Sequence, residues 1–154
     1  MRHIVNISSK TILTAIFVGS TVMLISCSDS KTDAKPAQAA NTQSKSLVVK
    51  HVDAHGAQAL LSANPQVVVL DVRSPKEIED GHIEGAVFAN FFDDDFKQQL
   101  TRFEKDTHYL VHCKGGGRST KALAALEELG FTNITHMDGG LDDWKRADLP
   151  LSKP

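Results

Sequence analysis

The residues most able to do chemistry in this sequence lie together in one short segment, residues 111–120, which reads VHCKGGGRST. Cys113 follows an apolar run that predicts a buried strand, and Arg118 begins the next predicted helix. Three glycines, residues 115–117, stand between them. Successive glycines let backbone N–H groups converge on one point, and a helix start adds unpaired donors and a positive dipole end. The segment therefore predicts an anion site beside a sulfur nucleophile.

The same groups stabilise a thiolate over a thiol, so we expect the pKa of Cys113 to lie below its usual value. Lys114 and Arg118 add two formal positive charges. A thiolate beside an anion site indicates attack by sulfur on an anionic substrate. Cysteine phosphatases have one residue more between the cysteine and the arginine, so the four residues between Cys113 and Arg118 argue against a small cysteine phosphatase or an arsenate reductase.

Alternating strand and helix patterns surround this segment. Apolar and β-branched runs predict strands at about residues 47–52, 67–70, 86–90, 108–112 and 134–137. Start and stop signals predict helices at about residues 53–62, 74–81, 93–103, 118–129 and 141–145. This alternation predicts an α/β fold with a central, mostly parallel five-stranded sheet and helices on both faces. Ligands bind at the carboxyl ends of such strands, where Cys113 is expected.

Five motifs in chain order resemble the rhodanese-domain sulfurtransferases. The active loop resembles the Cys-x-x-Gly-x-Arg pattern of that family. The other four motifs are LDVR at 70–73 with Glu77, GHIEGA at 81–86, ELGF at 128–131 and GGLDDW at 139–144. The resemblance covers about residues 47–150 and implies a single rhodanese-like three-layer domain at 47–154.

The resemblance implies a sulfurtransferase with Cys113 as the catalytic residue. A persulfide on Cys113 would carry sulfane sulfur from thiosulfate or a similar donor to a thiol or cyanide acceptor. The implied substrate-binding residues are Lys114, Gly115, Gly116, Gly117 and Arg118. Arg73 is a further candidate for substrate contact, although an ion pair with Glu77 is the favoured alternative for it.

Other roles and partners follow from the same residues. A non-catalytic persulfide carrier or a sulfur-sensing module would use the same Cys113 chemistry and stays open. The resemblance implies no metal ion and no organic cofactor. We expect a monomer whose partners are a small-molecule sulfur donor and a thiol acceptor.

The length of 154 residues allows one domain, or one domain with an appendage, and 41% hydrophobic and 23% charged residues are an ordinary globular composition. A net charge of -2 gives no reason to expect nucleic acid as a partner. Two cysteines exclude a disulfide framework and a four-cysteine zinc site.

Residues 1–26 have the order of a bacterial lipoprotein signal peptide. A basic start precedes an apolar stretch at 11–25 that is shorter than the about 20 residues of a membrane span. The stretch ends LISC, which resembles the lipobox, so lipidation is expected at Cys27. Residues 27–46 then form a polar segment that predicts a flexible tether. We expect a lipid-anchored, periplasm-facing protein of the cell envelope, and Ser28 favours the outer over the inner membrane in a Gram-negative cell.

Overall fold

The computed structural model describes residues 46–153 of the chain. The expected signal peptide, the lipidation of Cys27 and nearly all of the tether lie outside these residues. Within residues 46–153, no helix has both the length and the apolar character needed to cross a membrane.

The predicted alternation of strands and helices is confirmed in the described part of the chain. The strands are β1 (Val48–Val52), β2 (Val68–Asp71), β3 (Val87–Phe88), β4 (His108–His112) and β5 (Asn133–Met137). The helices are α1 (Ala54–Ala63), α2 (Pro75–Ile78), α3 (Phe96–Leu100), α4 (Gly117–Glu128) and α5 (Gly140–Arg146).

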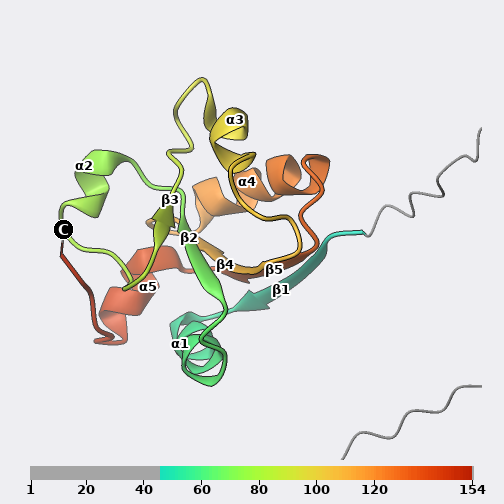
Figure 1. Ribbon diagram of the computed structural model, residues 1–154. Coiled ribbons are helices and arrows are strands. Elements are labelled where there is room, and N and C mark those ends of the chain that lie inside the picture. The colour runs from blue at the N-terminus through green and yellow to red at the C-terminus, as the bar shows by residue number, and fades with distance from the viewer. Residues whose placement is uncertain (1–45, 154) are drawn as a thin grey trace, which may run out of the picture. The chain divides into compact units, whose positions relative to one another are not determined.

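The five strands form one sheet in the order β1-β5-β4-β2-β3, and every pair of neighbours runs parallel (Figure 1). β4 lies in the middle of this sheet, with β5 on one side and β2 on the other. The segment that follows β4 therefore emerges at the centre of the carboxyl edge.

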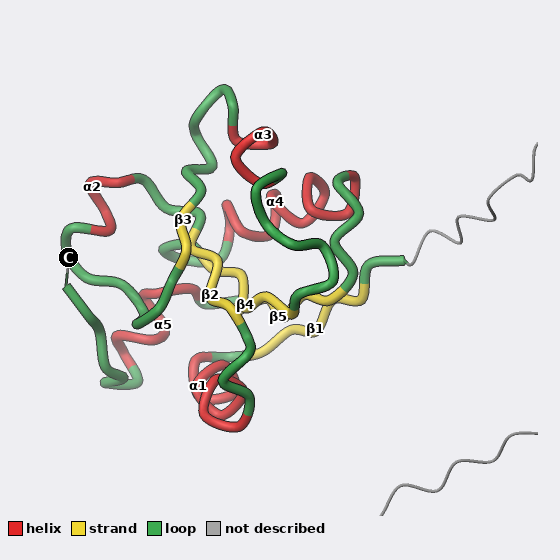
Figure 2. The backbone as a smooth tube through the Cα atoms, in the orientation of Figure 1, coloured by secondary structure: helices red, strands yellow, loops and turns green. Residues whose placement is uncertain are grey.

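Helices cover both faces of the sheet, so the predicted three-layer α/β architecture is confirmed. Successive side chains of β4 point to opposite faces. Tyr109 and Val111 pack in one core cluster with side chains of α3 and α4, whereas Leu110 packs in a second cluster with side chains of α1 and α5. Figure 2 shows α4 and α1 on opposite sides of the strands.

The largest difference from the predicted elements concerns the acidic run before α3. The sequence predicted a helix over residues 93–103, but α3 covers only Phe96–Leu100. The side chain of Gln99 donates hydrogen bonds to Asp93 (2.8 Å) and Asp95 (2.7 Å). The acids thus accept bonds in the turn that precedes the helix and do not extend the helix itself.

Candidate active site

Cys113 follows β4 at the carboxyl end of the sheet, where the sequence placed it, and it is 1% exposed. The short loop after it leads into α4, which begins at Gly117. Gly116 in this loop has a φ of +88°, and a Cβ atom there would lie 1.7 Å from the carbonyl oxygen of Asp138. Both the dihedral angle and the space therefore require glycine at this position.

The start of α5 holds the loop from the other side. The backbone N–H groups of Leu141 and Asp142 donate to the carbonyl oxygens of Cys113 (2.9 Å) and Lys114 (2.8 Å). Gly140 allows this approach, because a Cβ there would lie 2.5 Å from the carbonyl oxygen of Lys114. The closing Gly-Gly motif of the sequence therefore fixes the position of the loop.

The pKa of the Cys113 thiol lies below its usual value, in the predicted direction. Burial raises this pKa, but hydrogen bonds to the sulfur outweigh burial. The largest of them comes from the hydroxyl of Ser119, whose Oγ lies 3.5 Å from Sγ. Backbone N–H groups of Ser119, Arg118 and Gly115 add to it. The backbone donors follow from the glycine-rich loop and the helix start, whereas no local sequence signal points to the Ser119 hydroxyl.

Arg118 is tied to α2 by a two-pronged ion pair with Glu77. Its Nη1 and Nη2 atoms lie 2.7 Å and 2.6 Å from the two carboxylate oxygens. This pair lowers the pKa of Glu77 to about 2 and raises the pKa of Arg118. Glu77 offsets the formal charge of Arg118, so Cys113 does not face two unpaired cations, although Arg118 also interacts with the Cys113 sulfur.

The favoured ion pair between Arg73 and Glu77 is wrong. Arg73 is buried, and its Nη2 atom lies 2.7 Å from the carboxylate of Asp71. Its Nη1 and Nη2 groups also donate to the backbone carbonyls of Glu77 (2.8 Å) and Gly81 (2.9 Å). Arg73 thus ties the end of β2 to the last turn of α2 and to the turn after it. Its contact with substrate stays a prediction without support from these contacts.

A second residue that the sequence analysis did not single out, His136 on β5, lies behind Ser119. The Nε2 atom of His136 is 2.8 Å from Ser119 Oγ, and its Nδ1 atom is 2.7 Å from the carboxylate of Asp138. The Nδ1 atom of His51 lies 2.7 Å from the same carboxylate oxygen. A chain of polar contacts therefore runs from the Cys113 sulfur to two side chains that are more than half exposed.

The same cluster bears on metal binding. His51, His136 and Asp138 form the group of metal-ligand side chains found among residues 46–153, with ligand atoms within 4.8 Å of one another. These atoms already form hydrogen bonds within the group. The geometry is that of a hydrogen-bond network, and the expectation of no metal stays a prediction.

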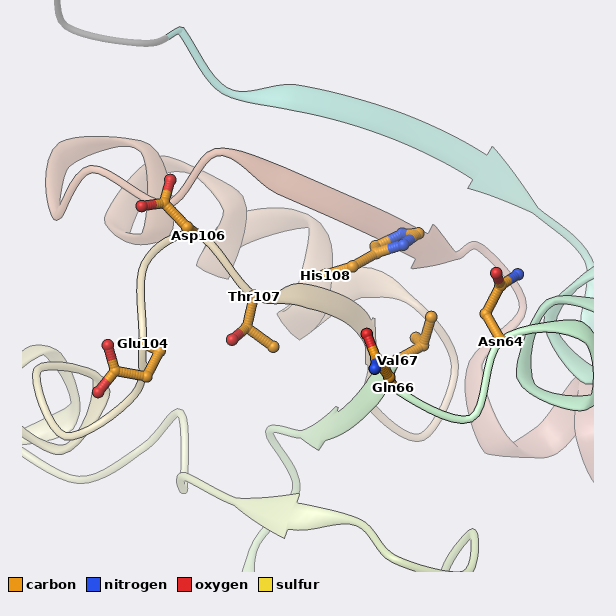
Figure 3. A pocket seen from close by; sticks show the side chains of 7 residues that line it. All are labelled: Asn64, Gln66, Val67, Glu104, Asp106, Thr107 and His108. Carbon is orange, nitrogen blue, oxygen red and sulfur yellow. The ribbon is translucent and has the colours of Figure 1, made fainter. Parts of the chain in front are cut away.

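A cavity of about 650 Å³ lies at the other end of the sheet and is not part of this site. Figure 3 shows its lining side chains, which come from the segments that lead into β2 and β4. They are Asn64, Gln66, Val67, Glu104, Asp106, Thr107 and His108. These segments precede β2 and β4, whereas Cys113 follows the carboxyl end of β4.

The fold and the loop together define a parallel α/β domain that holds a buried cysteine of lowered pKa at the start of a glycine-rich loop. Residues 53–147 match the family model of the rhodanese-like domain, which spans more than half of the chain. The chain therefore belongs to the rhodanese-like domain family.

Sulfurtransferases are among its relatives. The chain is 27% identical over 107 residues to a sulfurtransferase of Allochromatium vinosum, with 70% of this chain and 98% of that protein covered. It is 34% identical over 91 residues to thiosulfate sulfurtransferase 16, chloroplastic, of Arabidopsis thaliana, with 53% of this chain and 76% of that protein covered. The structure is similar to that of a rhodanese-related protein from Thermoplasma volcanium, with a TM-score of 0.60 and 27% identity over 68% of this chain and 99% of that chain. These relatives support a transferase of the sulfurtransferase class.

Proposed function

We propose that this protein moves sulfane sulfur from thiosulfate, or a similar donor, to a thiol through a persulfide on Cys113. The observation that carries the proposal is the lowered pKa of a buried cysteine whose sulfur is surrounded by hydrogen-bond donors. A thiolate is the reactive form of cysteine, and the donors that stabilise it also suit an anionic donor and its anionic leaving group.

The reaction has two balanced steps. The Cys113 thiolate attacks the outer sulfur of thiosulfate, the S–S bond of thiosulfate breaks, and sulfite leaves with the bonding electron pair. The Cys113 persulfide anion takes up one proton from solvent. A thiolate acceptor then attacks its outer sulfur, the S–S bond to Cys113 breaks, and the Cys113 thiolate leaves. Each step forms one bond to sulfur and breaks another, so no external oxidant or reductant is needed.

The charge at the loop bears on the choice of donor. Lys114 and Arg118 supply two formal positive charges, which by themselves would favour a dianionic donor such as thiosulfate. Glu77 offsets one of these charges, so we propose that backbone N–H groups carry most of the preference for a dianion. Accordingly, Lys114→Gln is expected to reduce the rate with thiosulfate by less than tenfold, as a screened surface charge does.

Mass spectrometry of the intact protein tests the proposal. Thiosulfate is expected to add the mass of one sulfur atom, on the peptide that contains Cys113, and Cys113→Ser is expected to abolish the addition. An unchanged mass after thiosulfate would contradict the sulfurtransferase function. Steady turnover with thiosulfate and a small thiol would favour an enzyme, whereas loading without turnover would favour the persulfide carrier or sensor.

We further propose that lipid attached to Cys27 anchors the protein to a membrane of the cell envelope, facing the periplasm. The order of a basic start, a short apolar stretch and LISC supports this anchor. Two or more acyl chains bind a bilayer stably, since each buried CH₂ contributes about 0.8 kcal/mol. Labelling of cells with a fatty-acid precursor is expected to mark the protein and not its Cys27→Ser variant. Label that persists in Cys27→Ser would contradict the anchor.

A further inference from the structure

The buried position of Cys113 raises the question of where its proton goes. The side chain is 1% exposed, so water has little direct access to the thiol. The contact chain described above, from Cys113 through Ser119 and His136 to Asp138, links the sulfur to a carboxylate that is 57% exposed. Ser119 and His136 in the middle of this chain are both buried.

The sheet brings these groups together from three places in the sequence. His136 on β5 pairs with Val111 of β4 on one side and with His51 of β1 on the other. Ser119 lies in the first turn of α4, directly above the end of β4. The rings of His51 and His136 meet edge to face, with their centroids 5.3 Å apart. The strand order and the position of the first turn of α4 thus bring the residues of this contact chain together.

The partners of His136 indicate which of its ring nitrogens carries the hydrogen. Asp138 is ionised at neutral pH, because hydrogen bonds from His51 and His136 hold the pKa of its carboxyl below the usual range. A carboxylate only accepts, so His136 carries a hydrogen on Nδ1. When His136 is neutral, its Nε2 atom is therefore an acceptor for the Ser119 hydroxyl. Ser119 Oγ then offers a lone pair to the thiol of Cys113.

We propose that Ser119, His136 and Asp138 form a proton relay for Cys113, in which His136 is the base and acts through the Ser119 hydroxyl. The Cys113 proton passes to Ser119 Oγ while the Ser119 proton passes to His136 Nε2. One S–H and one O–H bond break, and one O–H and one N–H bond form. The products are a thiolate and an imidazolium, and the imidazolium is held by the Asp138 carboxylate.

The relay changes what Ser119 does for the sulfur. After the transfer, Nε2 of His136 donates to Ser119 Oγ, and the single hydroxyl hydrogen of Ser119 turns toward the thiolate. The carbonyl oxygen of Gly116, 2.8 Å from Ser119 Oγ, is a third acceptor for this hydrogen, and the hydrogen leaves it when it turns to the thiolate. The same base thus removes the proton and supplies the bond that stabilises the remaining charge. His136 is a positioning and proton-accepting residue that does not touch the sulfur itself.

Other ionisable groups lie around the relay. His112, on the strand that packs beside β5, is fully buried, and burial lowers its pKa in spite of the nearby Asp71. Arg118 faces Cys113 from α4 and is paired with Glu77. Further ionisable neighbours are His51 on β1, Lys114 in the loop and Asp142 on α5, whose carboxylate lies beside Gly115.

The rate of alkylation of Cys113 by iodoacetamide as a function of pH tests the relay in the full chain. Peptide mapping by mass spectrometry separates Cys113 from Cys27. In His136→Gln, the amide can still hydrogen bond to Ser119 but cannot hold a proton. We expect the midpoint of the alkylation profile to rise by about one pH unit, which is about a tenfold lower rate below the midpoint. An unchanged midpoint in His136→Gln would overturn the proposal, because it would assign His136 a purely structural role.

Three further variants sharpen the test. Asp138→Asn, at an exposed site, is expected to raise the midpoint by a smaller amount, and Asp80→Asn, an exposed aspartate elsewhere, is expected to leave it unchanged. Ser119→Ala breaks the link between base and sulfur. Residues of one relay are energetically coupled. The double variant Ser119→Ala with His136→Gln is therefore expected to shift the midpoint of the alkylation profile no further than the larger of the two single shifts. Additive shifts would contradict a relay.

The relay proposal rests on the proposed function only in taking Cys113 as the reactive group. The relay and the sulfurtransferase function can therefore be contradicted separately. Alkylation needs no sulfur donor. An altered pH profile without sulfur loading by thiosulfate would support the relay and contradict the sulfurtransferase proposal. Sulfur loading with an unaltered profile in His136→Gln would do the reverse.

Discussion

At the scale of single residues, the site depends on pairings that leave few charges free. Glu77 accepts two hydrogen bonds from Arg118 and two more from the backbone N–H and hydroxyl of Ser74. The carboxylate therefore joins the start of α2 to the start of α4. Arg118 also lies over the ring of Phe92, 5.2 Å from its centroid, which restricts the guanidinium further.

Glu77→Gln is expected to destabilise the fold by about 2 kcal/mol at neutral pH, because a neutral amide in place of the carboxylate loses the charge-assisted hydrogen bonds to Arg118. The pKa of Glu77 is about 2 in the folded protein and 4.5 without these partners. A lowered carboxyl pKa contributes stability above the higher value, and this stability is lost as the pH falls toward the lower one. The gap in unfolding free energy between wild type and variant should therefore narrow from about pH 4.5 to pH 2.

Urea denaturation across this pH range measures the gap. Glu79→Gln, an exposed carboxylate two residues further along, is the matched control and is expected to stay within about 0.5 kcal/mol of wild type. A deficit for Glu77→Gln that is equally large at pH 2.5 and at pH 7 would show that lost packing, and not the ion pair, is responsible.

At the scale of elements, the loop is set by the close approach of two helix starts. α4 begins beside the backbone that leads into α5, and Gly116 lies where these segments meet. Gly117, the next residue, has open space around its Cα on the Cβ side. A side chain at Gly116 would therefore overlap the backbone of Asp138, whereas a side chain at Gly117 would not contact other atoms.

Gly116→Ala is expected to cost about 3 kcal/mol of stability, because it combines a strained positive φ with a steric overlap that the backbone must relieve. Gly117→Ala should stay near wild-type stability or gain up to about 1 kcal/mol, since alanine favours a helix more than glycine does. Denaturation of both variants, together with sulfur loading of Cys113, measures the difference. Equal losses in the two variants would refute the close-approach argument.

Much of this arrangement could be predicted from the sequence, and the rest could not for a physical reason. Local periodicity gave the strands and helices, and the glycine-rich loop after β4 indicated the anion site. The partner of Arg118 and the contact between Ser119 and His136 depend on strand order and on the direction of side chains. No local pattern encodes these, so Glu77 was paired with Arg73, and His136 was missed.

At the scale of the whole molecule, the buried histidine next to the active cysteine links stability to pH. His112 is fully buried, its Nδ1 atom contacts the carbonyl oxygen of Cys113, and its Nε2 atom has no hydrogen-bond partner within residues 46–153. Burial lowers the pKa of His112 below the usual 6.5. The folded state therefore holds this ring neutral at a pH where the unfolded chain would protonate it.

This difference makes the unfolding free energy fall with acidification below about pH 6.5. A lowered histidine pKa contributes stability above the unfolded value, and the stability is lost as the pH falls toward the folded value. One proton taken up on unfolding gives a slope of about 1.4 kcal/mol per pH unit. His112→Asn, whose amide can still donate to the carbonyl oxygen of Cys113, is expected to flatten this slope between pH 6.5 and pH 5.

His108, whose pKa burial also lowers, should contribute a smaller slope that His108→Asn removes separately. The contribution of Glu77 to stability changes with pH only below about pH 4.5, so chemical denaturation between pH 7 and pH 5 reports on the histidines. An equal slope in wild type and His112→Asn would contradict the assignment.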